Sequence, residues 1–221
     1  MLENQMMLLA VFERAALMLM TLFLLTRTRP FQRLFQKRDH TPAELVLVAS
    51  IFCLFAVFST YTGIPVEGAL INVRIIAIIS GGILFGPWVG IPAGVISGLH
   101  RYLIDMDGHT SIPCLIASII AGLLATWLHL RCRKSRLWLY GILAGMLCEG
   151  LTMLLIWLLT EPHEVGVEIV SHIAYPMIAG ALCIGLIIKL VQDLDDEKEL
   201  IAAKQAKLAL DIANQTLPFF Q

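Results

Sequence analysis

Long apolar stretches dominate this sequence and restrict the folds that are open to it. Hydrophobic residues make up 58% of the 221 residues and charged residues only 15%, whereas a typical soluble domain has roughly 45–50% and 25%. The mean hydropathy is +0.80. So few polar side chains cannot cover a folded surface in water, which excludes a water-soluble enzyme. The composition predicts an all-α fold, a polytopic bundle of transmembrane helices.

The apolar stretches divide the chain into membrane segments. A helix needs roughly 20 residues to cross a hydrocarbon layer about 30 Å thick. Residues 71–104 are too long for one crossing and short for two, and Gly86-Pro87 at their middle is a turn signal. The other segments are single helices, which we expect at about residues 6–26, 43–62, 112–130, 138–160 and 169–191.

The basic residues predict the topology, because cytoplasmic loops are enriched in Lys and Arg. Five basic residues lie within 27–38 and four within 131–136, while residues 63–70, 105–111 and 161–168 contain none. Both basic loops fall on one side if residues 71–104 cross twice. This gives about seven segments, with the N-terminus outside and the C-terminus inside. A re-entrant pair at 71–104 satisfies the rule equally well.

The last 29 residues have a different character, with six acidic and three basic side chains from residue 193 onward. Leu194, Ile201 and Leu208 are spaced by seven, which fits a coiled-coil stalk. A solvated amphipathic helix end is the alternative. We therefore expect a transmembrane ligand-receptor domain at 1–192 and a cytoplasmic stalk helix at 193–221.

Glycine recurs at every fourth position in the middle of the chain. Small residues at this spacing let helix backbones approach closely in lipid. Tight packing of the 71–104 pair is the favoured interpretation, although interrupted helices also frame binding sites in transporters. The residues concerned are Gly82, Gly86, Gly90, Gly94 and Gly98.

Two arginines inside apolar segments are candidates for ligand binding, because ionisable residues are expensive there. In the predicted topology Arg74 and Arg101 lie at similar depth near the outer face. A guanidinium binds a carboxylate through two parallel hydrogen bonds. The pair predicts a site for an anionic ligand, with Asn72 and His100 beside it. The alternatives are snorkelling to the interface, or ion pairs with Glu67 or Asp105.

Other polar residues of the segments have weaker claims to function. Cys114 begins the fifth segment at the outer face, where packing is the favoured role and a contact with ligand the alternative. His172 lines the same cavity or caps the interface, and Glu149 has no evident partner. Glu13 and Arg14 are adjacent charges, which we expect to neutralise each other.

No motif predicts a reaction, a cofactor or a metal. The five cysteines lack metal-binding spacing, and no phosphate-binding loop is present. Asp105-Met106-Asp107-Gly108 is only a fragment of a calcium loop, and His163-Glu164 falls on the outer side, away from ATP. No basic face remains for a nucleic acid.

Several short motifs occur in an order that resembles the membrane receptor domain of LytS-type sensor histidine kinases, and among them the pyruvate-responsive members. They are Asn72-Val73-Arg74, Ser80-Gly81-Gly82, Gly86-Pro87, Gly98-Leu99-His100-Arg101 and Pro113-Cys114. The resemblance implies a receptor for extracytoplasmic pyruvate that is coupled through a stalk to a GAF domain and a kinase. It also implies a homodimer and a response regulator that is reached through the kinase.

The resemblance also implies the binding residues. In the pyruvate-binding members two arginines, a cysteine and a serine form the site, and the first three correspond to Arg74, Arg101 and Cys114. The serine position is Ala117 here; the adjacent Ser118 would point about 100° away on a helix.

Two functions from different classes follow. The first is a sensory input module, either truncated or separate, because the chain stops at Gln221 before any GAF or kinase sequence. The alternative is a small-solute transporter or its substrate-binding membrane subunit. The charged, heptad-bearing tail favours the sensor, and kinase motifs downstream of residue 221 would decide between them. A purely structural anchor leaves both arginines unexplained.

Overall fold

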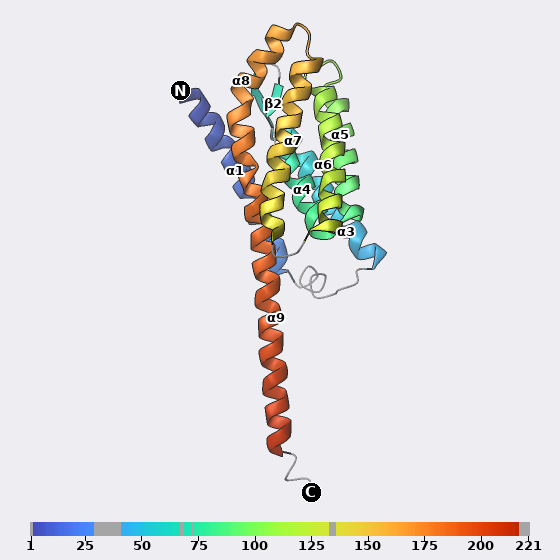
Figure 1. Cartoon of the computed structure of the whole chain (residues 1–221), viewed down its shortest axis with the longest axis vertical. Helices are drawn as coiled ribbons and strands as arrows, with labels where there is room; N and C mark the ends of the chain where they lie inside the picture. The colour runs from blue at the N-terminus through green and yellow to red at the C-terminus, as the bar shows by residue number, and fades with distance from the viewer. Residues whose placement is uncertain (1, 29–40, 67–68, 72, 133–135, 217–221) are drawn as a thin grey trace. The chain divides into compact units, whose positions relative to one another are not determined.

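The computed structural model describes residues 2–28, 41–66, 69–71, 73–132 and 136–216 (Figure 1). Two compact units divide at Ile188 and Lys189. The elements are α1 (Leu2–Arg27), α3 (Pro42–Tyr61), β1 (Ile64–Val66), β2 (Ala69–Ile71), α4 (Arg74–Phe85), α5 (Pro87–Ile104), α6 (Ser111–Arg131), α7 (Leu137–Leu159), α8 (His163–Gly180) and α9 (Leu182–Thr216).

Within the described residues, four helical stretches are long and apolar enough to cross a membrane. They are α3, α6, α7 and the stretch His163–Ala213, which contains α8 and α9, while α4 is a shorter apolar helix. The predicted all-α membrane bundle is therefore confirmed. The sequence analysis treated 63–70 as a plain loop, but β1 and β2 form a short antiparallel hairpin, with Ile64 paired to Ile71.

The expected turn within 71–104 is present, and the last expected segment, 169–191, lies inside a longer helical stretch. Helix α4 ends at Gly86, whose φ of 79° lies in the left-handed region that glycine tolerates. Pro87 then occupies the first turn of α5, where its missing N–H costs nothing. The helix that contains the start of this segment begins before residue 169. Helix α8 starts at His163, directly after Pro162.

Helix α4 is the centre of the first unit. It contacts α3, α5, α6 and α7, and nearly all of its residues are buried. Its 12 residues rise about 18 Å, well short of a 30 Å hydrocarbon layer. Gly82 and Gly90, four residues on either side of Gly86, face each other closely. Helices α4 and α5 are thus an antiparallel pair in which α4 is a half-length helix enclosed by the others.

The repeat was expected to pack the two halves of 71–104 together, which Gly82 and Gly90 do, but the glycines of α5 also pack against α6. A Cβ on Gly94 would lie 2.5 Å from the carbonyl oxygen of Ser118, and a Cβ on Gly122 would lie 2.5 Å from that of Gly90. Contacts this short leave no room for a side chain. The repeat therefore brings the backbones of α5 and α6 together.

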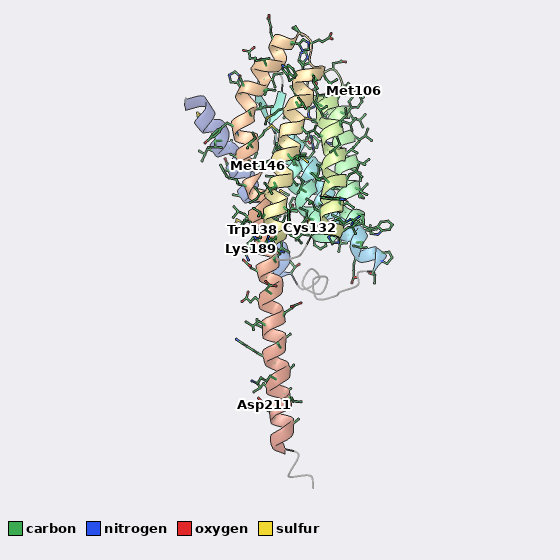
Figure 2. All side chains as sticks on the ribbon, viewed as in Figure 1. Met106, Cys132, Trp138, Met146, Lys189 and Asp211 are labelled. Carbon is green, nitrogen blue, oxygen red and sulfur yellow. The ribbon has the colours of Figure 1, made fainter. Side chains whose placement is uncertain are left out.

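The first unit has two distinct ends. At one end Thr160 Oγ1 donates to the carbonyl oxygen of His109, 3.4 Å away. This bond joins the α5–α6 loop to the start of the α7–α8 connection. We call this end the arginine end, because Arg101 lies on the last turn of α5 next to that loop. At the other, His129 Nδ1 lies 2.8 Å from the carbonyl oxygen of Ile83, beside the Gly86 turn. Figure 2 shows Met106 at the arginine end and Cys132 with Trp138 at the opposite one.

The second unit, from Lys189 onward, is the continuation of α9 as far as Thr216. Its side chains are mostly exposed, including Ile201 and Leu208. Lys189 forms an ion pair with Asp193, at 2.5 Å between Nζ and Oδ1. The predicted heptad residues thus stand on a continuous helix.

Candidate functional site

Arg101 lies on the last turn of α5, and its side chain is completely buried. Its Nη1 and Nη2 each donate to Oδ2 of Asp105 at 3.3 Å. Nη2 also donates to Oγ1 of Thr110 at 3.1 Å. The ion pair with Asp105, which was one alternative at the sequence level, is therefore formed. Arg101 reaches across the α5–α6 loop to the residue that precedes α6.

Arg74 is the first residue of α4 and is 2% exposed. Its Nη2 donates to the carbonyl oxygen of Cys114, 3.4 Å away. The same carbonyl accepts a hydrogen bond of 2.6 Å from Ser118 Oγ. Arg74 also interacts electrostatically with the buried carboxyl of Glu149 on α7. Among the described residues, Oε2 of Glu149 has no hydrogen-bond partner.

The two arginines, 27 positions apart in the sequence, reach the same place. Arg101 contacts Thr110, the residue before α6, and Arg74 contacts Cys114, in the first turn of that helix. The N-terminus of a helix carries a partial positive charge. Two buried guanidinium groups beside it form an environment that favours an anion. We call Arg74, Arg101 and the start of α6 the arginine site.

Asp105 is the acid of the arginine site. Its side chain is 37% exposed, whereas that of Arg101 is fully covered. Ser111 Oγ donates to its backbone carbonyl, which ties the loop to α6. A carboxylate oxygen of Asp105 thus occupies the fork of Arg101, the group with which a ligand carboxylate would pair. An anionic ligand has to displace this oxygen or bind beside it.

The remaining predicted site residues are placed as follows. Cys114 is a buried free cysteine in the first turn of α6, and Ser118 follows one turn later. His100 Nε2 lies 3.2 Å from the hydroxyl of Tyr61, and its ring meets the tyrosine ring edge to face. His172 Nδ1 lies 2.9 Å from the carbonyl of Glu168 within α8, so no described contact joins it to the arginines.

Asn72 was also predicted near this site, and it lies outside the described residues, as does Glu67. Among the described residues, no group of three or more His, Cys, Asp or Glu side chains could hold a metal ion.

Sequence reasoning missed two participants. Thr110 was not considered. It lies two residues before the predicted segment at 112–130, and its hydroxyl makes no capping hydrogen bond but accepts one from Arg101. Tyr61, the partner of His100, lies 39 positions away at the end of α3. No local pattern could have joined it to His100.

The chain is similar in sequence to one protein family and to several sensor proteins. The family described as 5TMR of 5TMR-LYT matches residues 28–194. The sensor histidine kinase YpdA of Escherichia coli K12 is 60% identical over 97% of the chain. The sensor protein LytS of Bacillus subtilis 168 is 31% identical over 96%, and the sensor histidine kinase BtsS of E. coli K12 is 29% identical over 94%. The chain covers 38% of the length of each of these three relatives.

No solved structure matches the chain significantly. The family match extends over most of the chain, from before α3 into α9, and so contains the whole arginine site. The apolar helices agree with a multi-pass protein of the inner membrane. The chain belongs to the 5TMR-LYT family and is a membrane sensory domain of the kind found in LytS-family sensor histidine kinases.

Proposed function

We propose that this chain is the sensory input module of a two-component sensor histidine kinase and that it binds extracytoplasmic pyruvate or a similar small 2-oxo acid. The observation that carries the proposal is the convergence of buried Arg74 and Arg101 on the first turn of α6. Phosphotransfer, the response regulator and the homodimer belong to the parent protein in this proposal. Family membership favours the sensor over the transporter alternative.

The chemistry of the arginine site suits a small carboxylate. Pyruvate has six heavy atoms, so it gains at most about 9 kcal/mol at roughly 1.5 kcal/mol per atom. Micromolar affinity corresponds to about 8 kcal/mol. A ligand of this size therefore reaches micromolar affinity only if both guanidinium groups contribute. Both of these side chains are buried.

Cys114 and Ser118 have different roles in this proposal. The Cys114 carbonyl is held by Arg74 and by the Ser118 hydroxyl. Ser118 therefore acts on the site through this carbonyl, while Ala117 occupies the position that carries a serine in the pyruvate-binding members. The Cys114 thiol is the polar group of this turn that remains for a ligand.

The direct test is isothermal titration calorimetry of the purified chain in detergent. We expect saturable binding of pyruvate with one site per chain and weaker binding of lactate, whose hydroxyl replaces the ketone. If no 2-oxo acid binds to the folded protein, the proposal is contradicted and the transporter alternative is favoured instead.

The arginine end should face the outside of the cell. Single cysteines at Val66 and Asp107 should react with an impermeant maleimide added to intact cells, and cysteines at Leu34 and Lys134 only after permeabilisation. Asp107 is preferable to Gly108, because a side chain on Gly108 would collide with Asp105. These single cysteines should be introduced into a chain in which Cys132 has been replaced. Cys132 is partly exposed and would react itself, whereas the other four native cysteines are buried. Labelling of 107 and 134 from the same side would contradict this orientation.

The stalk in the second unit should contribute to dimerisation. Leu194, Ile201 and Leu208 place one apolar residue per heptad on one face of α9, so the seam is narrow. Ile201→Asp puts a charge in it and should reduce the dimer fraction several-fold in detergent, measured by analytical ultracentrifugation. Ala206→Asp adds the same charge to the opposite face and should change nothing. An unchanged dimer fraction in Ile201→Asp would exclude this seam.

A further inference from the structure

A small pocket lies in the first unit, away from the contacts of the arginine site. It has a volume of about 80 Å³ between α1 and α3, and Val73 before α4 closes one side. Its polar lining comes from Arg14 and Thr21 on α1 and from Ser59 and Thr62 at the end of α3. The hydroxyl of Thr21 already donates to the carbonyl of Leu17. The other walls are apolar: Leu17, Met18, Phe55, Phe58 and Val73.

Arg14 brings a positive charge into this pocket. Its Nη1 is buried and has no hydrogen-bond partner among the described residues. Leaving a guanidinium N–H without a partner is costly, most of all in an apolar setting. The adjacent Glu13, an expected neutralising partner, is exposed and makes no described ion pair with Arg14.

Ser59 provides a second, independent observation. Its side chain is 3% exposed, and its Oγ has no hydrogen-bond partner among the described residues. Most other buried hydroxyls of the helices donate to the carbonyl four residues earlier, as the hydroxyls of Ser80, Ser97, Ser118, Thr126 and Thr152 do. Thr60 Oγ1 also lacks a partner among the described residues, but Thr60 does not line this pocket. Ser59 departs from that pattern in the same pocket that Arg14 lines.

We propose that Arg14 and Ser59 form a second anion site, which binds a small monocarboxylate of the size of acetate. The guanidinium and the hydroxyl bind the carboxylate, and the apolar walls accept its short carbon chain. One buried water needs about 10–15 Å³ of accessible space of this kind, so a pocket of about 80 Å³ has room for a ligand of several heavy atoms. The apolar lining favours a carboxylate with a methyl group over a bare halide.

This inference is independent of the proposed function, because it uses none of the residues of the arginine site. Val73 lines the pocket and immediately precedes Arg74. A carboxylate bound here bridges α1 to α3 and touches the start of α4.

The test measures equilibrium binding of ¹⁴C-acetate to the full chain in detergent, in an Arg74→Ala/Arg101→Ala background without the arginine pair. We expect one saturable site to remain. Arg14→Gln should weaken it at least tenfold and Ser59→Ala about threefold or more, because each removes a donor to the carboxylate. Ser50→Ala is the matched control, since that hydroxyl of α3 already donates to the carbonyl of Val46 at 2.8 Å; it should change nothing.

A second readout covers the case in which the double variant does not fold. In the wild-type chain, acetate should slow the modification of Arg14 by phenylglyoxal, followed by mass spectrometry. Three results would overturn the proposal. The first is that acetate neither binds nor protects Arg14, or that Arg14→Gln, in a protein of unchanged circular dichroism, has no effect on binding. The second is that equimolar chloride displaces acetate. The third is that a phospholipid co-purifies with the wild-type chain and is lost in Arg14→Gln.

Discussion

Arg74→Ala and Arg101→Ala, made one at a time, should each weaken pyruvate binding by at least tenfold. A charge-assisted hydrogen bond contributes about 1.5–3 kcal/mol, and 1.4 kcal/mol corresponds to a factor of ten. Arg→Lys at either position should restore only part of the affinity, because an ammonium group lacks the planar fork. Calorimetry of each folded variant against pyruvate gives the ratio of dissociation constants directly.

Two further variants separate ligand binding from structural roles at this site. Cys114→Ser should cost less than either arginine change, because a hydroxyl keeps a donor of similar size. Asp105→Asn removes the carboxylate that occupies Arg101, so it should leave the affinity equal or higher. If Asp105→Asn weakened binding as much as Arg101→Ala, Arg101 would serve the ion pair with Asp105 and not the ligand. Unchanged binding in both arginine variants would remove this site from the proposal.

Gly94→Ala should destabilise the protein, although glycine to alanine within a helix ordinarily stabilises by roughly 0.5–1 kcal/mol. The new Cβ would lie 2.5 Å from the backbone oxygen of Ser118, so α5 and α6 have to separate. Overpacking of this kind costs about 1–3 kcal/mol, which corresponds to a fall in Tm of about 2–12 °C for a domain of this size. Thermal unfolding in detergent, followed by circular dichroism, measures it.

Gly150→Ala is the control for this change, because a Cβ on Gly150 meets nothing within 4 Å. Its Tm should stay the same or rise slightly. Gly94→Ala should also weaken pyruvate binding, since Arg101 lies on α5 and Cys114 on α6. A Tm for Gly94→Ala equal to that of Gly150→Ala would show that the α5–α6 contact is looser than described.

Much of the fold could be predicted from the sequence, because lipid imposes simple local rules. A helix satisfies its own backbone in the absence of water, so long apolar runs had to be helices. Gly86-Pro87 had to interrupt one of them, and it does so at the residue with positive φ. The glycine repeat predicted close helix packing for the same reason, since the spacing of small residues is a property of one helix face.

The start of α8 and the β1–β2 hairpin were not predictable by the same rules. Residues 163–168 have the polar composition of a loop, yet they continue α8 toward the arginine end. The strands are three residues each, too short for an alternating pattern to be distinguished from a loop.

The sequence by itself determined that two arginines stand at matching depths of an antiparallel helix pair, because chain length from the Gly86 turn sets that depth. Their partners were decided only by tertiary structure. Arg74 meets the carbonyl of Cys114 40 positions away, and a backbone carbonyl leaves no trace in side-chain patterns. Arg14 and Ser59 likewise come to one pocket from separate helices. Contacts between helices depend on how their faces pack, and that packing is a property of the whole bundle.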